Sequence, residues 1–189
     1  MAEKWINEVY DKIIVKEQKV AKRNAHKIPY TTHNGVFDDK SGKDICWWTN
    51  GFWGGMMWQL YYATKDEMYR TIAIENEEKL DANLMNRQGM DHDSGFKWLP
   101  TAVAHYHLDG NAESRNRALL AADNLAGRFN PVGCFIRAWN NWDGNEDGSF
   151  AGRAIIDCMM NLPLLYWAGD ELHDPKFYHV ATMHADTAM

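Results

Sequence analysis

The chain has 189 residues, of which 46% are hydrophobic and 24% charged, and its formal net charge is −6 at pH 7. This length and this balance are typical of a globular protein with one buried core. Lysine and arginine form no block, which excludes nucleic acid from the expected partners.

A long helix over residues 4–25 is the first predicted element, because Trp5 and Val9 begin an apolar stripe at helical spacing. Loops are predicted around Pro29 and over residues 38–43. The N-terminal segment has no apolar signal core, and no apolar run is long enough to span a membrane. The three cysteines form no C-x-x-C pair and indicate reduced thiols. We therefore expect a cytoplasmic protein.

Three units of similar character follow, each with a polar or aromatic junction, an apolar helix, a tight turn and an amphipathic helix. The junctions stand at residues 47–51, at residues 91–95 and near Arg153. Pro100 and Pro163 fall in or close to the first turns of apolar helices, where proline is tolerated. The expected apolar helices span residues 52–63, 98–108 and 155–168, and the amphipathic helices span residues 67–85, 113–128 and 175–189.

An inner ring of apolar helices inside an outer ring of amphipathic helices fits this alternation, and it predicts an all-α toroid. A plain α-solenoid or bundle fits less well, since the repeat is irregular and the aromatic loop over residues 129–150 is elaborate. Strand signals are weak, and no linker divides residues 1–189, so we expect one domain. About seven helices are predicted where a closed double ring needs roughly twelve, which indicates an incomplete, N-terminal part of a barrel.

Parallel inner helices would bring the three junctions, and with them Trp48, His92, Asp93 and Asp157, to one rim. Asp157 stands in the largely apolar stretch of residues 154–165. Burial there would raise the pKa of its carboxyl, as a general acid requires near neutral pH. A helix N-cap, which would lower the pKa, is the alternative for Asp157 and equally for Asp93.

A metal site is not expected. Adjacent residues such as Asp91 and His92 rarely converge on one ion, and the spacing of known histidine motifs is absent. His105 and His107 face different directions on a helix and are interpreted as a structural or exposed pair. The nine tryptophans, eight tyrosines and seven phenylalanines suit a carbohydrate-facing cavity or a bulky core equally well.

The motifs at residues 48–53, 91–96, 128–140 and 156–165 resemble the hallmarks of unsaturated glucuronyl hydrolases, glycoside hydrolase family 88, and the streptococcal type in particular. The similarity covers essentially the whole chain. It implies an (α/α)6 barrel that needs no cofactor. The implied substrate is an unsaturated glycosaminoglycan disaccharide, such as a chondroitin or hyaluronan fragment left by a polysaccharide lyase.

The resemblance also assigns roles to residues. Asp157 would be the acid/base that protonates the double bond and activates water, and Asp93 would hold the sugar hydroxyls and tune Asp157. Contacts with the sugar are expected from Trp48, His92, Trp139 and Arg137.

Family members are considerably longer than this chain, so we expect poor activity and self-association from an exposed half of a barrel core. Two other interpretations remain open. One is an unsaturated rhamnogalacturonyl hydrolase acting on pectin fragments, against which the His-Asp-Ser-Gly-Phe motif at residues 92–96 argues. The other is an inactive, truncated remnant that binds sugar.

Overall fold

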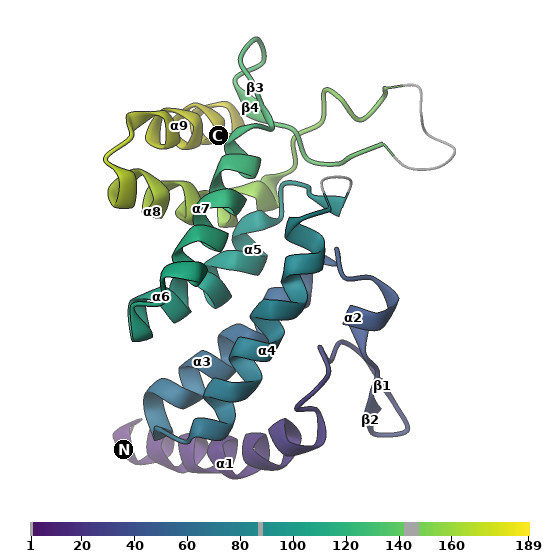
Figure 1. Cartoon of the computed structure of the whole chain (residues 1–189), viewed down its shortest axis with the longest axis vertical. Helices are drawn as coiled ribbons and strands as arrows, with labels where there is room; N and C mark the ends of the chain where they lie inside the picture. The colour runs from purple at the N-terminus through teal and green to yellow at the C-terminus, as the bar shows by residue number, and fades with distance from the viewer. Residues whose placement is uncertain (1, 87–88, 142–147) are drawn as a thin grey trace.

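The computed structural model describes residues 2–86, 89–141 and 148–189, and these are mainly helical (Figure 1). The helices follow one another along the long axis, from α1 at the N-terminal end to α8 and α9 near the C-terminus. This architecture confirms the all-α prediction. The helices of the described residues are α1 (Ala2–Arg23), α2 (Lys40–Lys43), α3 (Phe52–Thr64), α4 (Glu67–Leu84), α5 (Ser94–Trp98), α6 (Ala104–Asp109), α7 (Ala112–Ala126), α8 (Leu162–Leu172) and α9 (Pro175–Ala188).

Shorter elements connect the helices. The prediction of a loop over residues 38–43 is wrong in part, because α2 forms a single helical turn there, where the Asp39 side chain accepts a hydrogen bond from Ser41 N. In the part of the chain that the structure describes, the weak strand signals correspond to two antiparallel hairpins with strands of two residues each. The remaining elements are the strands β1 (Thr32–His33), β2 (Val36–Phe37), β3 (Phe129–Asn130) and β4 (Phe135–Ile136), the 3-10 turns η1 (Trp48–Gly51) and η4 (Ile156–Met160), and the π-helical segment η3 (Leu99–Val103).

The three predicted units are present, and their helix-to-helix breaks are built alike. Each first helix ends at a residue in the left-handed conformation, and the next residue caps the second helix by accepting a backbone N–H bond on its side chain. The residue pairs are Lys65 and Asp66 before α4, Gly110 and Asn111 before α7, and His173 and Asp174 before α9. Local capping therefore folds each unit into a helical hairpin.

Proline has different positions in two of the units. Pro163 lies in the first turn of α8, as predicted. Pro100 does not lie near a helix start, because it falls in η3, midway along the helical run from α5 to α6. Proline has no N–H and its ring crowds the carbonyl one turn back, so the helix widens locally to a π turn.

Two apolar clusters form the core. One packs α3 and α4 against the end of α1, and the other packs α5, α7, α8 and α9 together. Their largest buried side chains include Met57, Trp58 and Tyr69 in the first and Trp98, Leu125 and Phe177 in the second. Among the described residues, no helix is both long enough and apolar enough to cross a membrane.

A buried polar cluster links α4, α6 and α7. Glu77 is only 1% exposed, accepts a hydrogen bond of 2.6 Å from Ser114 Oγ, and lies 2.9 Å from His105 Nδ1 and 3.2 Å from Arg117 Nη1. Serine, histidine and acid meet here as in a nucleophile triad, but all three side chains are shielded from solvent. The cluster therefore cross-links helices, and His105 has a structural position.

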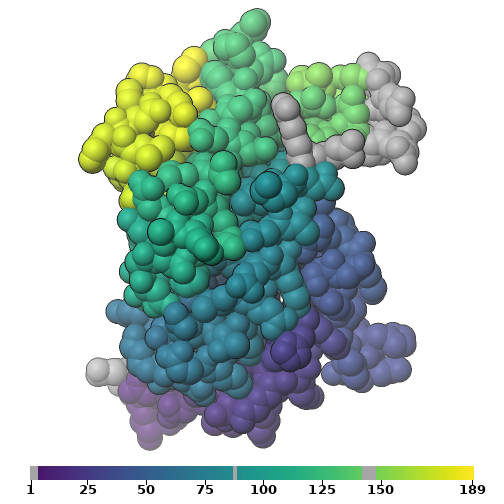
Figure 2. Space-filling view, in the orientation of Figure 1, coloured from purple at the N-terminus to yellow at the C-terminus, as the bar shows by residue number. Residues whose placement is uncertain are grey.

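Helix α1 forms one end of the molecule, at the bottom of the space-filling view (Figure 2). Its apolar stripe is largely uncovered, since Trp5 is 64% exposed and Ile6 is 55% exposed, whereas Val20 and Ala21 near its C-terminal end are buried. An apolar surface of this kind favours association with other surfaces. The expected self-association stays a prediction.

Candidate functional site

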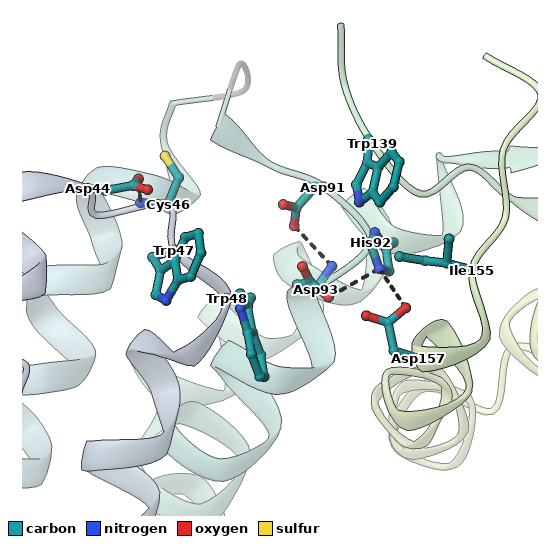
Figure 3. Close-up of a pocket in the computed structure, with 10 residues that line it drawn as sticks. All are labelled: Asp44, Cys46, Trp47, Trp48, Asp91, His92, Asp93, Trp139, Ile155 and Asp157. Atoms are coloured by element: carbon teal, nitrogen blue, oxygen red, sulfur yellow. Dashed lines mark hydrogen bonds and ion pairs between the residues drawn. The ribbon is translucent and has the colours of Figure 1, made fainter. Parts of the chain in front are cut away.

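A pocket of about 500 Å³ opens where the three junctions meet (Figure 3). One wall comes from the segment that precedes α3, a second from the turn that precedes α5, and a third from η4 and the loop before it. The lining residues are Asp44, Cys46, Trp47, Trp48, Asp91, His92, Asp93, Trp139, Ile155 and Asp157. The predicted convergence of the junctions is therefore present in the structure.

Two glycines allow the junctions to come this close. A Cβ on Gly51 would stand 2.5 Å from the Cα and carbonyl oxygen of Lys97, so η1 packs directly on the backbone of α5. A Cβ on Gly95 would stand 2.7 Å from the carbonyl oxygen of Asn161, so the start of α8 packs on the other side of α5. Any larger residue would force these backbones apart.

His92 stands between two carboxyl groups that come from different units. Its Nε2 lies 3.2 Å from Oδ1 of Asp93 and 3.2 Å from Oδ1 of Asp157 (Figure 3). Its Nδ1 lies 2.7 Å from the carbonyl oxygen of Ala138, which can only accept, so Nδ1 carries a hydrogen. A hydrogen bond at Nε2 therefore needs another proton, either on the imidazole or on one of the carboxyl groups.

The two carboxyl groups differ in exposure. The Asp93 side chain is 11% exposed, whereas the Asp157 side chain is 46% exposed. Burial raises the pKa of Asp93 to about 6; nearby Asp91 and Asp157 raise it further, and His92 and Lys97 oppose the rise. The desolvated acid of this site is thus Asp93.

The prediction that Asp157 is the desolvated acid is wrong. Its apolar neighbours Cys158, Leu162 and Leu164 point into the core, while η4 presents Asp157 to the open pocket. An apolar stretch in the sequence does not show which side of a short helical turn faces solvent.

Neither carboxyl group acts as a helix cap. Asp157 lies inside η4, and the N-cap residue of α8 is Asn161. Asp93 has the N-cap position of α5, but its side chain accepts no capping hydrogen bond. Both side chains line the pocket. The capping alternative is thereby excluded for these two residues.

The buried Asp93 gives a prediction about stability and pH. Its pKa of about 6 lies above the ordinary value of 3.8, so the folded state binds this proton more tightly than the unfolded chain. Its stabilising contribution is complete below pH 3.8 and is lost as the pH rises through 6. Asp93→Asn imitates the uncharged carboxyl. As the pH rises from 4 to 7, its free energy of unfolding should gain on the order of 2–3 kcal/mol relative to that of the unchanged chain.

Urea unfolding at a series of pH values measures this difference in the free energy of unfolding. Asp186→Asn is the matched control, because Asp186 is exposed and lies on α9 away from the pocket. Its difference from the unchanged chain should stay flat with pH. A flat difference for Asp93→Asn as well would show that Asp93 is not desolvated.

The predicted sugar contacts divide into two groups. Trp48, His92 and Trp139 line the pocket, and Trp48 is 38% exposed, with its ring 5.4 Å from that of Phe96. Arg137 does not line it. Its Nη2 donates to Asn141, and its side chain lines a neighbouring pocket of about 470 Å³ together with Arg128 and other polar residues. The structure therefore gives no support for Arg137 as a contact with the same sugar.

Sequence reasoning missed two residues that organise the site. Asn161 accepts a hydrogen bond of 2.8 Å from Phe96 N, and its amide lies 3.5 Å from both Asp93 Oδ1 and the carbonyl oxygen of Asp157. Its position four residues after Asp157 could have indicated a place on the same helical face. Lys97 is fully buried next to the pocket, in contact with Cys46 and Asp91, and nothing in the sequence distinguishes it from an exposed helical lysine.

One group of possible ligand atoms occurs among the described residues, formed by His92, Asp93 and Asp157 within 4.8 Å of one another. Asp91 is not in the group. A cation here would have to replace both contacts of His92 Nε2 with the carboxyl groups. Since a shared proton satisfies the same three side chains, we assign no metal to them, and the expected absence of a metal stays a prediction.

Comparisons with known proteins agree on one family. No protein-family model matches the chain. The chain is 40% identical over 139 residues to an unsaturated glucuronyl hydrolase of Bacillus sp. (strain GL1), which covers 73% of this chain and 36% of that protein. It is 37% identical over 138 residues to an unsaturated chondroitin disaccharide hydrolase of Streptococcus pneumoniae, covering 72% of this chain and 34% of the relative.

Solved structures give the same result over more of the chain. The crystal structure of the Bacillus sp. GL1 enzyme matches with a TM-score of 0.80 and 31% identity, covering 97% of this chain and 48% of the other. That of a Streptococcus agalactiae enzyme matches with a TM-score of 0.73 and 30% identity, over 94% and 46%. The chain thus spans about half of these structures, consistent with an N-terminal half. Sequence and fold together show that it belongs to the unsaturated glucuronyl hydrolases.

Proposed function

We propose that this chain carries the acid/base centre of a hydrolase that removes 4,5-unsaturated glucuronic acid from glycosaminoglycan disaccharides such as chondroitin or hyaluronan fragments. One observation carries the proposal: two carboxyl groups from separate helical units, Asp93 and Asp157, meet at His92 Nε2 inside a pocket bordered by tryptophans. The chondroitin disaccharide hydrolases among its relatives support this class of substrate.

The exposed Asp157 is the group that meets the substrate. Its carboxyl donates a proton to C4 of the C4=C5 enol ether, and positive charge then develops at C5 and the ring oxygen. The carboxylate left behind takes a proton from water as the water oxygen bonds to C5. The proton taken from water restores the carboxyl for the next cycle. The hemiketal opens to a ketone at C5, and the hemiacetal left at C1 collapses to an aldehyde as it expels the neighbouring sugar.

The buried Asp93 and His92 keep a proton within reach of Asp157. Burial of Asp93 favours its protonated form up to about pH 6, and His92 Nε2 touches both carboxyl groups. A proton can therefore pass along this contact without crossing bulk water. We assign acid/base contact with the substrate to Asp157 and the holding of the proton to the pair formed by Asp93 and His92.

Trp48 and Trp139 provide flat apolar surfaces in the same pocket. Sugar rings present C–H faces that pack against such surfaces, and the dry contact favours burial of the reacting double bond. Asp44 and Asp91 add negative charge to the lining. The uronate carboxylate is therefore expected to bind away from Asp44 and Asp91.

Incubation of the purified chain, in excess over an unsaturated chondroitin disaccharide, tests the proposal. We expect loss of the ultraviolet absorbance of the conjugated double bond, with release of one amino sugar for each bond lost. The saturated disaccharide is the control and should stay intact, because it has no enol ether to protonate. Dialysis against a chelator should leave the rate unchanged if no metal takes part.

Three results would contradict the proposal. Consumption of unsaturated rhamnogalacturonan instead of the chondroitin disaccharide would favour a pectin-directed enzyme. Binding without loss of absorbance would favour an inactive sugar-binding remnant. Absence of both binding and turnover would remove the sugar assignment from this chain altogether.

A further inference from the structure

Lys97, at the C-terminal end of α5, is a completely buried lysine next to the pocket but not part of its lining. Lysine is almost never fully buried unless its charge is paired. Its Nζ donates a hydrogen bond of 3.1 Å to the carbonyl oxygen of Cys46 and lies 3.8 Å from Oδ1 of Asp91. These two partners belong to different walls of the pocket.

Each partner leads directly to a residue of the proposed reaction. Cys46 is followed by two tryptophans, Trp47 and Trp48, which both line the pocket. Asp91 accepts a hydrogen bond of 3.0 Å from the backbone N of Asp93. One ammonium group thus holds the Cys46 carbonyl, just before the two tryptophans, and the carboxylate that orients Asp93.

Building on the proposed function, we propose that Lys97 is a positioning residue that fixes the aromatic wall to the acidic wall and balances the negative charge beneath the reacting carboxyl groups. It has no direct contact with the sugar, since its side chain has no exposed surface. Its effect reaches the reaction through Cys46 and Asp91.

The charges around the site agree with this role. Burial lowers the pKa of Lys97, and the carboxylates of Asp91, Asp93 and Asp44 oppose that change. In turn, the charge of Lys97 lowers the pKa of Asp93. The other titratable groups that act on Asp93 or respond to it are Asp91, His92, Arg128, Asp157 and Cys158. Loss of the Lys97 charge therefore raises the pKa of Asp93.

Lys97→Met keeps the length of the side chain and removes its charge. We expect kcat for the unsaturated disaccharide to fall about 10- to 100-fold with little change in KM, because the walls lose their common anchor. We also expect the alkaline limb of the kcat–pH profile to move to higher pH, since Asp93 keeps its proton longer. Lys97→Arg keeps the charge and should restore the limb to its original position.

Lys79→Met is the matched control. Lys79 also joins a backbone carbonyl, that of His26, to a carboxylate, that of Glu75, but it lies on α4 away from the pocket. Its loss should leave kcat and the pH profile unchanged. A purely structural lysine at position 97 would lower kcat without moving the limb, and that result would overturn the inference.

Asp91→Asn supplies a second test should Lys97→Met fail to fold. Asp91 raises the pKa of Asp93, so its neutralisation should move the limb in the opposite direction, to lower pH. A titration of the Asp93 carboxyl carbon by NMR reads the same two shifts without any turnover. Absence of turnover in the unchanged chain would end the proposed function, whereas an unmoved titration in both variants would end the role of Lys97.

Discussion

Asp157→Asn is expected to lower the turnover of an unsaturated chondroitin disaccharide by about 100- to 10,000-fold, the usual worth of a general acid/base. The amide cannot release a proton to C4, and its nitrogen cannot accept one from water. The side chain of Asp157 is 46% exposed, so the uncharged amide has no cavity to fill and no buried charge to leave unpaired. We therefore expect a folded protein whose binding of the disaccharide changes much less than its turnover.

Turnover and thermal unfolding should be measured together for Asp157→Asn and for Asp186→Asn, in which the replaced carboxyl is exposed on α9. Only the first variant should lose activity, and neither should unfold at a clearly lower temperature. Full activity in Asp157→Asn would remove this residue from the proposed mechanism. An equal loss in Asp93→Asn is compatible with it, because Asp93 holds the proton that Asp157 delivers.

The helical hairpins of this fold could be predicted because their signals are local. The turn before α4 is fixed by Lys65 and Asp66, and the turn before α9 by His173 and Asp174. Such caps act within a few residues and depend little on the rest of the chain. The interruption of a helix by Pro100 was not predicted, because a π turn keeps the run helical where proline usually ends it.

The meeting of Asp93 with Asp157 was also predictable, since both occupy the junction of a repeated unit. Their relative burial was not predictable, because it depends on which face of η4 is directed toward the pocket. The role of Lys97 depends on contacts with segments distant in sequence. The position of Arg137 in the neighbouring pocket could not be predicted for the same reason. Local pattern thus identified the carboxyl groups, whereas tertiary packing set their environment.

Gly95→Ala is expected to have a large effect for a single added methyl group. The new Cβ would stand 2.7 Å from the carbonyl oxygen of Asn161 and 2.8 Å from its Oδ1. The Cα of Asn161 is a third obstacle. Because this Cα and the carbonyl oxygen both belong to the backbone, no side-chain rotation relieves the clash. We expect a loss of about 1–3 kcal/mol in the free energy of unfolding, the usual cost of overpacking.

The same displacement should disturb the chemistry, because Asn161 follows the turn that carries Asp157, and α5 begins directly after Asp93. A shift of about 1 Å between these elements lowers the rate of a positioned reaction by up to about 100-fold. Gly152→Ala is the matched control, since a Cβ there meets no atom within 4 Å. Chemical unfolding and disaccharide turnover should change in Gly95→Ala alone. Equal behaviour of the two variants would mean that the contact between α5 and the start of α8 does not hold the two carboxyl groups together.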